Sequence, residues 1–221
     1  VNNTRKITSA MKMVASAKLH KAQAAIESML PYERRLHHIL TDFMSNCTEV
    51  TSPFIVKREV KKVAVVVFAS NTSLCGGFNA NVIRHLVDLL AEYKPLGLEN
   101  ILVFPVGKKV ADAVRKLGFR IEGDFQHMAD KPSYQEAADL AADLMKRFLH
   151  GDVDKVELLY NHFKSTASQI LTRETYLPID LNNEKKEEER TIDYILEPSA
   201  EELMQEMLPK VLRMKMFTVL L

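Results

Sequence analysis

The chain has 221 residues, of which 47% are hydrophobic and 27% are charged, and its formal net charge is only +1. This composition can build a core and excludes global disorder, and seven glycines favour a helix-rich fold. Two cysteines, Cys47 and Cys75, exclude a disulfide scaffold and a four-cysteine zinc site. Because no apolar run approaches the roughly 20 residues that span a bilayer and no secretory signal is visible, composition predicts a soluble intracellular protein.

The N-terminal segment is basic and has a helical composition. Its first 26 residues contain five Lys or Arg and no acidic residue before Glu27. The segment from Thr4 to Leu30 lacks Gly and Pro and is rich in Ala, Met, Lys and Gln, which predicts a long helix. The pattern resumes through Tyr32–Met44, and we expect Pro31 to kink or loosen the helix because proline removes a backbone donor.

One face of this helix is apolar but is built largely from small side chains. Its members recur at spacings of three, four or their sums: Ile7, Met11, Val14, Ala22, Ala25 and Met29. Small side chains let a second helix approach closely, but they bury too little area to hold a lone helix on a core. We therefore expect a partner helix, arranged with this one as a coiled coil.

After a polar connector from Asn46 to Glu59, predicted strands and helices alternate. The strands are Lys62–Ala69, Ile101–Val106, Val156–Tyr160, Gln169–Tyr176 and Ile192–Leu196, and the helices are Val82–Tyr93, Lys108–Leu117 and Tyr134–Leu149. Asn79 or Asn81 is a candidate cap for the first of these helices. The alternation predicts an α/β fold whose sheet is mainly parallel at first.

The C-terminal part contains an acidic run and a last helix. We expect a solvated loop over Asn182–Arg190 and a helix from about Ala200 to Leu221. That helix has no C-terminal signal, and the chain starts without Met, so we expect a fragment in which both end helices are cut. The predicted organisation is a helix over 1–45, an α/β domain over 60–198 and the start of a second long helix over 199–221.

The sequence offers no catalytic constellation. Gly76-Gly77 lies between a strand and a helix, where backbone N–H groups could hold a phosphate, but the G-x-G-x-x-G and P-loop spacings are absent. Cys75 precedes a helix but has no histidine partner in the sequence pattern, and adjacent His37-His38 cannot share a helix face. We expect a structural turn, an inert cysteine and no metal or cofactor site.

The basic helix is the stronger lead. A solvated face is one reading; nucleic-acid binding lacks aromatic residues interleaved with the cations, and membrane binding lacks bulky apolar residues opposite them. An acidic protein surface remains as the partner that suits it best.

Four segments, in order, resemble the gamma subunit family of F-type ATP synthases. They are Thr4–Leu19, Leu74-Cys75-Gly76-Gly77-Phe78-Asn79-Ala80-Asn81, Tyr160-Asn161-His162-Phe163-Lys164-Ser165 and Asp193-Tyr194-Ile195-Leu196-Glu197-Pro198. The resemblance covers essentially the whole chain. Asn71 and Ser73 depart from it, because the family usually has Asp and Gly at these positions.

The resemblance implies a non-enzymatic rotor stalk with no catalytic, cofactor or metal site. It implies a Rossmann-like sheet with flanking helices, and N- and C-terminal helices wound as an antiparallel coiled coil inside a ring of alpha and beta subunits. The α/β domain would face the epsilon subunit and the membrane c-ring, on the cytoplasmic face of the bacterial inner membrane.

By position, the resemblance assigns contact with the beta subunit to Arg5, Lys6, Met11 and Lys12. It assigns the foot that faces the c-ring to Tyr194, Leu196 and Glu197. Two other classes remain open from the residues alone. One is a small nucleotide-binding enzyme of Rossmann type that uses Gly76-Gly77, and the other is a helical nucleic-acid-binding protein.

Overall fold

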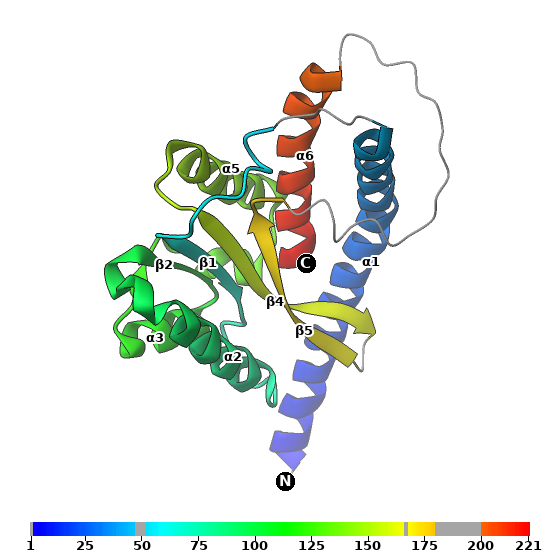
Figure 1. The fold of residues 1–221 in the computed structure, drawn as a ribbon. Helices are drawn as coiled ribbons and strands as arrows, with labels where there is room; N and C mark the ends of the chain where they lie inside the picture. Colours follow the sequence, from blue (N-terminus) through cyan, green and yellow to red (C-terminus); the bar gives the residue numbers. More distant parts are fainter. Residues whose placement is uncertain (1, 47–51, 166–167, 180–199) are drawn as a thin grey trace.

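The computed structural model describes residues 2–46, 52–165, 168–179 and 200–221 (Figure 1). Within the two end helices it does not describe the side chains of residues 2, 30, 33–34, 37–46 and 200–203. The elements, in chain order, are α1 (Asn2–Asn46), β1 (Val63–Phe68), α2 (Phe78–Tyr93), two 3₁₀ turns (Lys94–Leu96 and Leu98–Asn100), β2 (Ile101–Val106), α3 (Lys108–Leu117), β3 (Arg120–Ile121), α4 (Gln126–Asp130), α5 (Tyr134–His150), β4 (Lys155–Ser165), β5 (Ser168–Leu177) and α6 (Ala200–Leu220).

The strands form one sheet in the order β3-β2-β1-β4-β5. β1 pairs in parallel with both β2 and β4, β2 pairs in parallel with β3, and β5 returns antiparallel to β4. This arrangement confirms the predicted α/β class and the mainly parallel sheet. β1 and β2 are buried along their whole length, which is why their sequences are continuous apolar runs instead of alternating ones.

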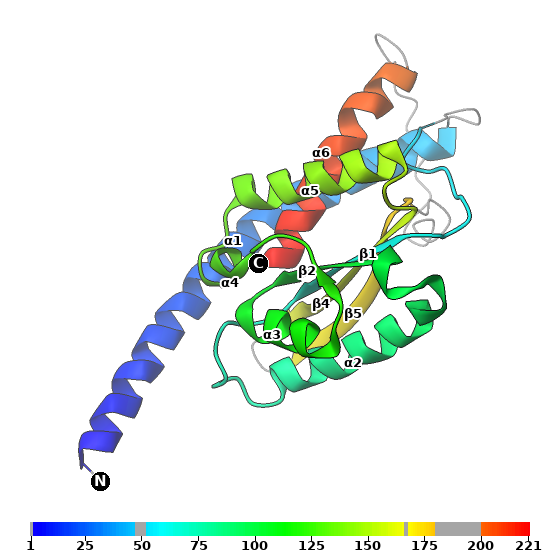
Figure 2. The same cartoon turned by 90° about the vertical axis from the view of Figure 1, so that its left-hand side faces the viewer.

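Helices cover both faces of the sheet (Figure 2). On one face, Val63, Val65 and Val67 of β1 pack with the apolar residues of α2 and α3. On the other face, the alternate residues Ala64, Val66 and Phe68 belong to a core shared with α4, α5 and α6. The period of two along β1 therefore divides its side chains between two cores.

The two end helices lie side by side and run in opposite directions (Figure 1). α6 has two roles, because one of its faces closes the α/β core and another meets α1. Its buried residues are Met204, Leu208, Leu212, Met216 and Val219. The predicted antiparallel pairing of N- and C-terminal helices is thereby confirmed in the described residues.

Several predicted details differ from the structure. α2 begins at Phe78, earlier than predicted, and no side chain caps it, so the capping role predicted for Asn79 or Asn81 is wrong. α1 continues as one helix through Pro31, and the kink or loosening expected there stays a prediction. The short elements β3 and α4 were not predicted. The predicted acidic loop and the strand Ile192–Leu196 lie outside the described residues.

Candidate functional site

The first five turns of α1 project beyond the α/β layers as a free helical arm (Figures 1 and 2). We define the N-terminal arm as residues 3–21, every one of which is exposed. At 1.5 Å per residue the arm is about 28 Å long. Because every residue of the arm is exposed, the arm presents side chains from all sides of the helix for contact.

The arm carries only positive charge. Arg5, Lys6, Lys12, Lys18 and Lys21 are exposed, and none forms an ion pair with a described residue. Arg5 and Lys12 are seven residues apart and therefore lie on nearly the same face, two turns from each other. Lys6 lies about a quarter turn around the helix from Arg5, so the charge covers a wide sector of the arm.

The sector of the arm opposite Arg5 and Lys12 carries apolar side chains in its first turns, followed at the same spacing by Lys18 and Lys21. Ile7, Met11 and Val14 are 61%, 51% and 59% exposed, although their spacing continues the stripe that meets α6 further along the helix. In that further part, the stripe residues Ala22, Ala25 and Met29 are half-buried. The apolar stripe is therefore covered where α6 lies beside it and uncovered in the arm.

This geometry separates the four residues that the sequence assigns to a beta-subunit contact. Arg5 and Lys12 point away from the stripe, because residues two apart on a helix, such as Arg5 and Ile7, face nearly opposite ways. Met11 belongs to the stripe itself. All four are exposed, so the structure brings them together on one arm but does not gather them on one face.

The loop after β1 is closed by its own side chains. The Ser70 N–H donates to Asn79 Oδ1 at 3.0 Å, and Asn79 Nδ2 donates to the Thr72 carbonyl at 2.8 Å. Asn79 is buried, and its amide also lies 3.0 Å from Cys75 Sγ. Asn79 thus fixes the loop across its base, which explains why it does not cap α2.

Asn71 connects this loop to two neighbouring elements. Its Oδ1 accepts a hydrogen bond from the Lys108 N–H at 2.7 Å, at the first residue of α3. Its Nδ2 donates to the Gln126 carbonyl at 2.8 Å, at the start of α4. An amide supplies both the acceptor and the donor, whereas a carboxylate supplies acceptors only. The departure of Asn71 from the family pattern is therefore accommodated by a donor contact of its own.

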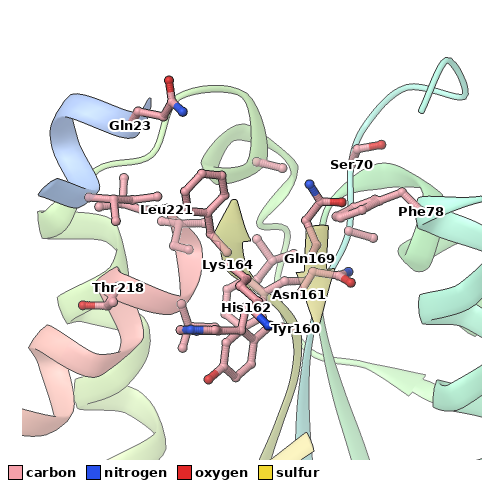
Figure 3. A pocket seen from close by; sticks show the side chains of 18 of the residues that line it. Gln23, Ser70, Phe78, Tyr160, Asn161, His162, Lys164, Gln169, Thr218 and Leu221 are labelled. Carbon is pink, nitrogen blue, oxygen red and sulfur yellow. The ribbon is translucent and has the colours of Figure 1, made fainter. Parts of the chain in front are cut away.

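A pocket of about 850 Å³ lies between the sheet and the helix pair. Figure 3 shows Gln23 of α1 with Thr218 and Leu221 of α6 on one side, Ser70 and Phe78 on the other, and residues of β4 between them. The carboxyl end of β1 opens into it, which is where α/β sheets bind ligands. Ser70 and Phe78 at the two ends of the loop line the pocket, whereas Gly76 and Gly77 are not among its lining residues.

The most buried charge lies on the other face of the sheet and was missed at the sequence level. Glu157 is 2% exposed and accepts from Tyr93 OH at 2.6 Å and from Arg173 Nε at 2.7 Å, and Lys155 Nζ lies 2.6 Å away. Arg173 also pairs with Glu92. The partners come from α2, β4 and β5, so sequence spacing gives no signal for the cluster.

These contacts shift the acidity of the cluster. Burial raises the pKa of the Glu157 carboxyl, but hydrogen bonds from Arg173, Lys155 and Tyr93 outweigh it, so the pKa lies below its ordinary value. Burial and the Glu157 hydrogen bond raise the pKa of the Tyr93 hydroxyl. Every oxygen of the buried carboxylate has a partner, which indicates a structural cluster and not a reactive one.

Other expectations have the following outcomes. Tyr194, Leu196 and Glu197, the predicted foot, lie outside the described residues, as do the side chains of His37 and His38. In the described part of the chain there is no group of three or more metal-ligating side chains. Among those same residues, no helix has both the length and the hydropathy needed to cross a membrane.

Comparisons with known proteins agree along the whole chain. A family model described as ATP synthase matches residues 1–221. The ATP synthase gamma chain of Phocaeicola vulgatus is 78% identical over 223 residues, covering 100% of this chain and 77% of that protein. The ATP synthase gamma chain of Bacteroides thetaiotaomicron is 58% identical over 229 residues, covering 99% of this chain and 77% of that protein.

A solved structure of an ATP synthase shares the fold. It is the central stalk and c-ring of the mitochondrial ATP synthase of Tetrahymena thermophila, with a TM-score of 0.64, 20% identity, and coverage of 97% of this chain and 91% of that chain. The end helices and the α/β domain thus recur together in a chain of a rotary stalk. Because the family model spans every residue and both relatives carry the same name, this chain belongs to the family of ATP synthase gamma chains.

Proposed function

We propose that this chain is the central shaft of a rotary ATP synthase and has no active site of its own. Torque from the membrane c-ring enters the α/β domain and turns the helix pair inside a ring of alpha and beta subunits. The asymmetric shaft then sets the nucleotide sites of that ring into different states. The epsilon subunit binds at the α/β domain, and the complex is attached to the cytoplasmic face of a bacterial inner membrane.

The exposed N-terminal arm is the observation that carries this proposal. It presents Ile7, Met11 and Val14 on one side and Arg5 and Lys12 on the other, and all five are exposed. Exposed apolar side chains in a continuous stripe mark a contact surface. The stripe suits a partner helix, and the basic sector, which stays uncovered when the stripe is filled, suits an acidic wall around the shaft.

We propose that Arg5, Lys6, Met11 and Lys12 contact the beta subunit. A contact that must form and break as the shaft turns should be weak, and exposed ion pairs contribute only about 0–1 kcal/mol each. Arg5, Lys6 and Lys12 supply that kind of contact, and Met11 adds an apolar contact at the edge of the stripe. Tyr194, Leu196 and Glu197 remain the proposed foot that faces the c-ring.

The decisive experiment reverses charge on the arm in the assembled complex. We expect Lys6→Glu with Lys12→Glu to lower ATP hydrolysis and ATP-driven proton pumping, because the new carboxylates repel an acidic ring surface. The matched control is Lys116→Glu, an exposed lysine at the end of α3, far along the chain from the arm. Unchanged coupling in the double variant would contradict the proposed electrostatic contact.

A ligand titration tests the alternative of a nucleotide-binding enzyme. We expect no tight, stoichiometric binding of ATP or NAD to the isolated chain, because the glycine turn does not open into the pocket. Calorimetry is the direct measurement. Stoichiometric binding of either nucleotide would overturn the view that the chain acts only as a rotor.

A further inference from the structure

Two polar contacts join α6 to the edge strand β5. The Tyr176 hydroxyl donates a hydrogen bond to the Leu212 carbonyl at 2.7 Å. In the second contact, Lys215 Nζ of α6 lies 3.2 Å from Glu174 Oε1 of β5. Glu174 and Tyr176 share one face of β5, and Leu212 and Lys215 are three residues apart on α6, so the two contacts lie next to each other. We call these four residues the β5–α6 joint.

The joint is anchored in the core at one end and open at the other. Tyr176 and Leu212 are each 4% exposed, and Leu208 and Met216, one turn to either side of Leu212, are fully buried. Burial raises the pKa of the Tyr176 hydroxyl well above its ordinary value, so the donor keeps its proton at physiological pH. Glu174 and Lys215 are half-buried, and their ion pair is close without being a directed hydrogen bond.

The described side chains of α1 make no comparable attachment. Among its described side chains none is buried, and their hydrogen bonds stay within the helix, from Thr8 to the Thr4 carbonyl and from Ser28 to the Ala25 carbonyl. α1 also contacts α6, and the stripe residues Ala22, Ala25 and Met29 in its described part are half-buried and apolar. An apolar contact of this kind resists separation but does little to fix rotation about the helix axis, since the described side chains of α1 make no directional bond across it.

We propose that torque passes from the α/β domain into the shaft through the β5–α6 joint, so that α6 is the driven helix and α1 follows it. A hydroxyl that must point at one carbonyl fixes the rotation of α6 about its own axis and its axial position. The ion pair, set off the helix axis, opposes the remaining rotation. This inference rests on the proposed rotor function and names the residues that position the shaft.

Charge reversal and rescue in the reconstituted complex test the joint. The variants are Glu174→Lys, Lys215→Glu and the double variant that restores the pair with opposite signs. The control is Glu206→Lys, which breaks the exposed Lys210–Glu206 ion pair within α6 and leaves the joint intact. The readout is protons pumped per ATP hydrolysed in complexes of equal subunit content, which a loss of folding or assembly alone would not change.

We expect each single reversal at the joint to lower that ratio, the double variant to recover it and Glu206→Lys to leave it unchanged. A ratio in Glu174→Lys equal to that of Glu206→Lys, or no recovery in the double variant, would overturn the joint as the torque path. Failure of the proposed rotor function would have a different result. In that case the unaltered chain would not assemble with the ring or support any pumping.

Hydrogen exchange gives a second measurement that does not depend on pumping. Tyr176→Phe keeps the ring and removes only the hydroxyl, so we expect about fivefold faster exchange of α6 amides around Leu212, the effect of one lost buried hydrogen bond. Exchange in α1 should change less if α1 follows α6. Unchanged exchange in α6 would show that the hydroxyl does not hold the helix and would count against the joint.

Discussion

Glu157 shows how one residue can matter to the fold without belonging to the functional surface. It is the one charged side chain that is buried among the described residues, and it sits in β4 between Val156 and Leu158. Three donors from different elements surround it. Breaking a buried pair by removing one charge leaves the other uncompensated, which costs more than the pair contributes when intact.

We therefore expect Glu157→Gln to destabilise the isolated chain by about 3 kcal/mol at neutral pH. The lowered folded-state pKa stabilises the fold above the ordinary pKa of a glutamate, near 4.5, and this contribution is lost as pH falls through the folded-state value. The difference in free energy of unfolding between the parent and the variant should be constant from pH 7 to about 5, and it should shrink below about pH 4. Urea unfolding across this range is the measurement, and a gap that grows with acidity would contradict the assignment.

Asn71 departs from the family pattern and links the loop after β1 to α3 and α4. It accepts from Lys108 N–H at the start of α3 and donates to the Gln126 carbonyl. We expect Asn71→Ala to cost about 1 kcal/mol, the usual loss for a helix cap, or about 3 °C in melting temperature for a chain of this size. Asn71→Asp should lose less, because it keeps the acceptor.

Calorimetric melting of both variants beside Asn81→Ala checks this prediction. Asn81 is exposed, and its side chain has no described hydrogen bond, so it serves as the matched control. Equal melting temperatures for Asn71→Ala and Asn81→Ala would show that the link to α3 and α4 contributes nothing.

At the scale of elements, the two end helices are unlike although both have apolar stripes. α6 inserts Leu208 and Met216 into the core, whereas Ile7 and Val14 of α1 stay exposed. We expect Leu208→Ala to destabilise the isolated chain by about 3 kcal/mol, the middle of the range for a buried leucine. Val14→Ala should stay within about 0.5 kcal/mol of the parent.

Chemical denaturation of the two variants measures this asymmetry directly. The isolated chain is the right sample, because assembly into the ring would cover the arm. A loss for Val14→Ala comparable with that of Leu208→Ala would mean that the arm is packed against the domain in solution and would contradict the structure.

The sequence predicted elements well wherever one pattern determines the structure. The continuous apolar runs at Val63–Phe68 and Ile101–Val106 are buried parallel strands, and α3 and α5 lie within one residue of their predicted bounds. The family resemblance came from motifs such as Thr4–Leu19 and is confirmed by the comparisons.

The features that escaped prediction depend on contacts between distant residues. Asn79 is of a residue type that often caps helices, but its side-chain amide is hydrogen-bonded to Ser70 and Thr72 across the loop. Periodicity showed an apolar face on α1 but could not show that only its later part meets α6. The Glu157 cluster and the β5–α6 joint depend on contacts such as Arg173–Glu157 and Tyr176–Leu212, between residues more than a dozen positions apart, for which a single sequence carries no spacing signal.

The whole molecule is electrically polarised along its length. The arm carries five positive charges, so at a total of +1 the rest of the chain has a net charge of −4. The arm also lies at one extreme of the molecule, away from the α/β layers (Figure 2). A net charge near zero therefore conceals a basic arm, and such an arm can steer the chain into an acidic opening.

This polarity predicts how assembly depends on salt. We expect association of the chain with a preformed alpha–beta ring to slow by about tenfold between roughly 0.05 and 0.5 M salt, since screening shortens the reach of the arm's field. Arg5→Glu with Lys12→Glu should remove most of that dependence, whereas Lys94→Glu with Lys116→Glu, exposed lysines of the α/β domain, should preserve it. Stopped-flow association rates separate these cases, and a salt slope equal in both double variants would show that net charge, not the arm, governs the encounter.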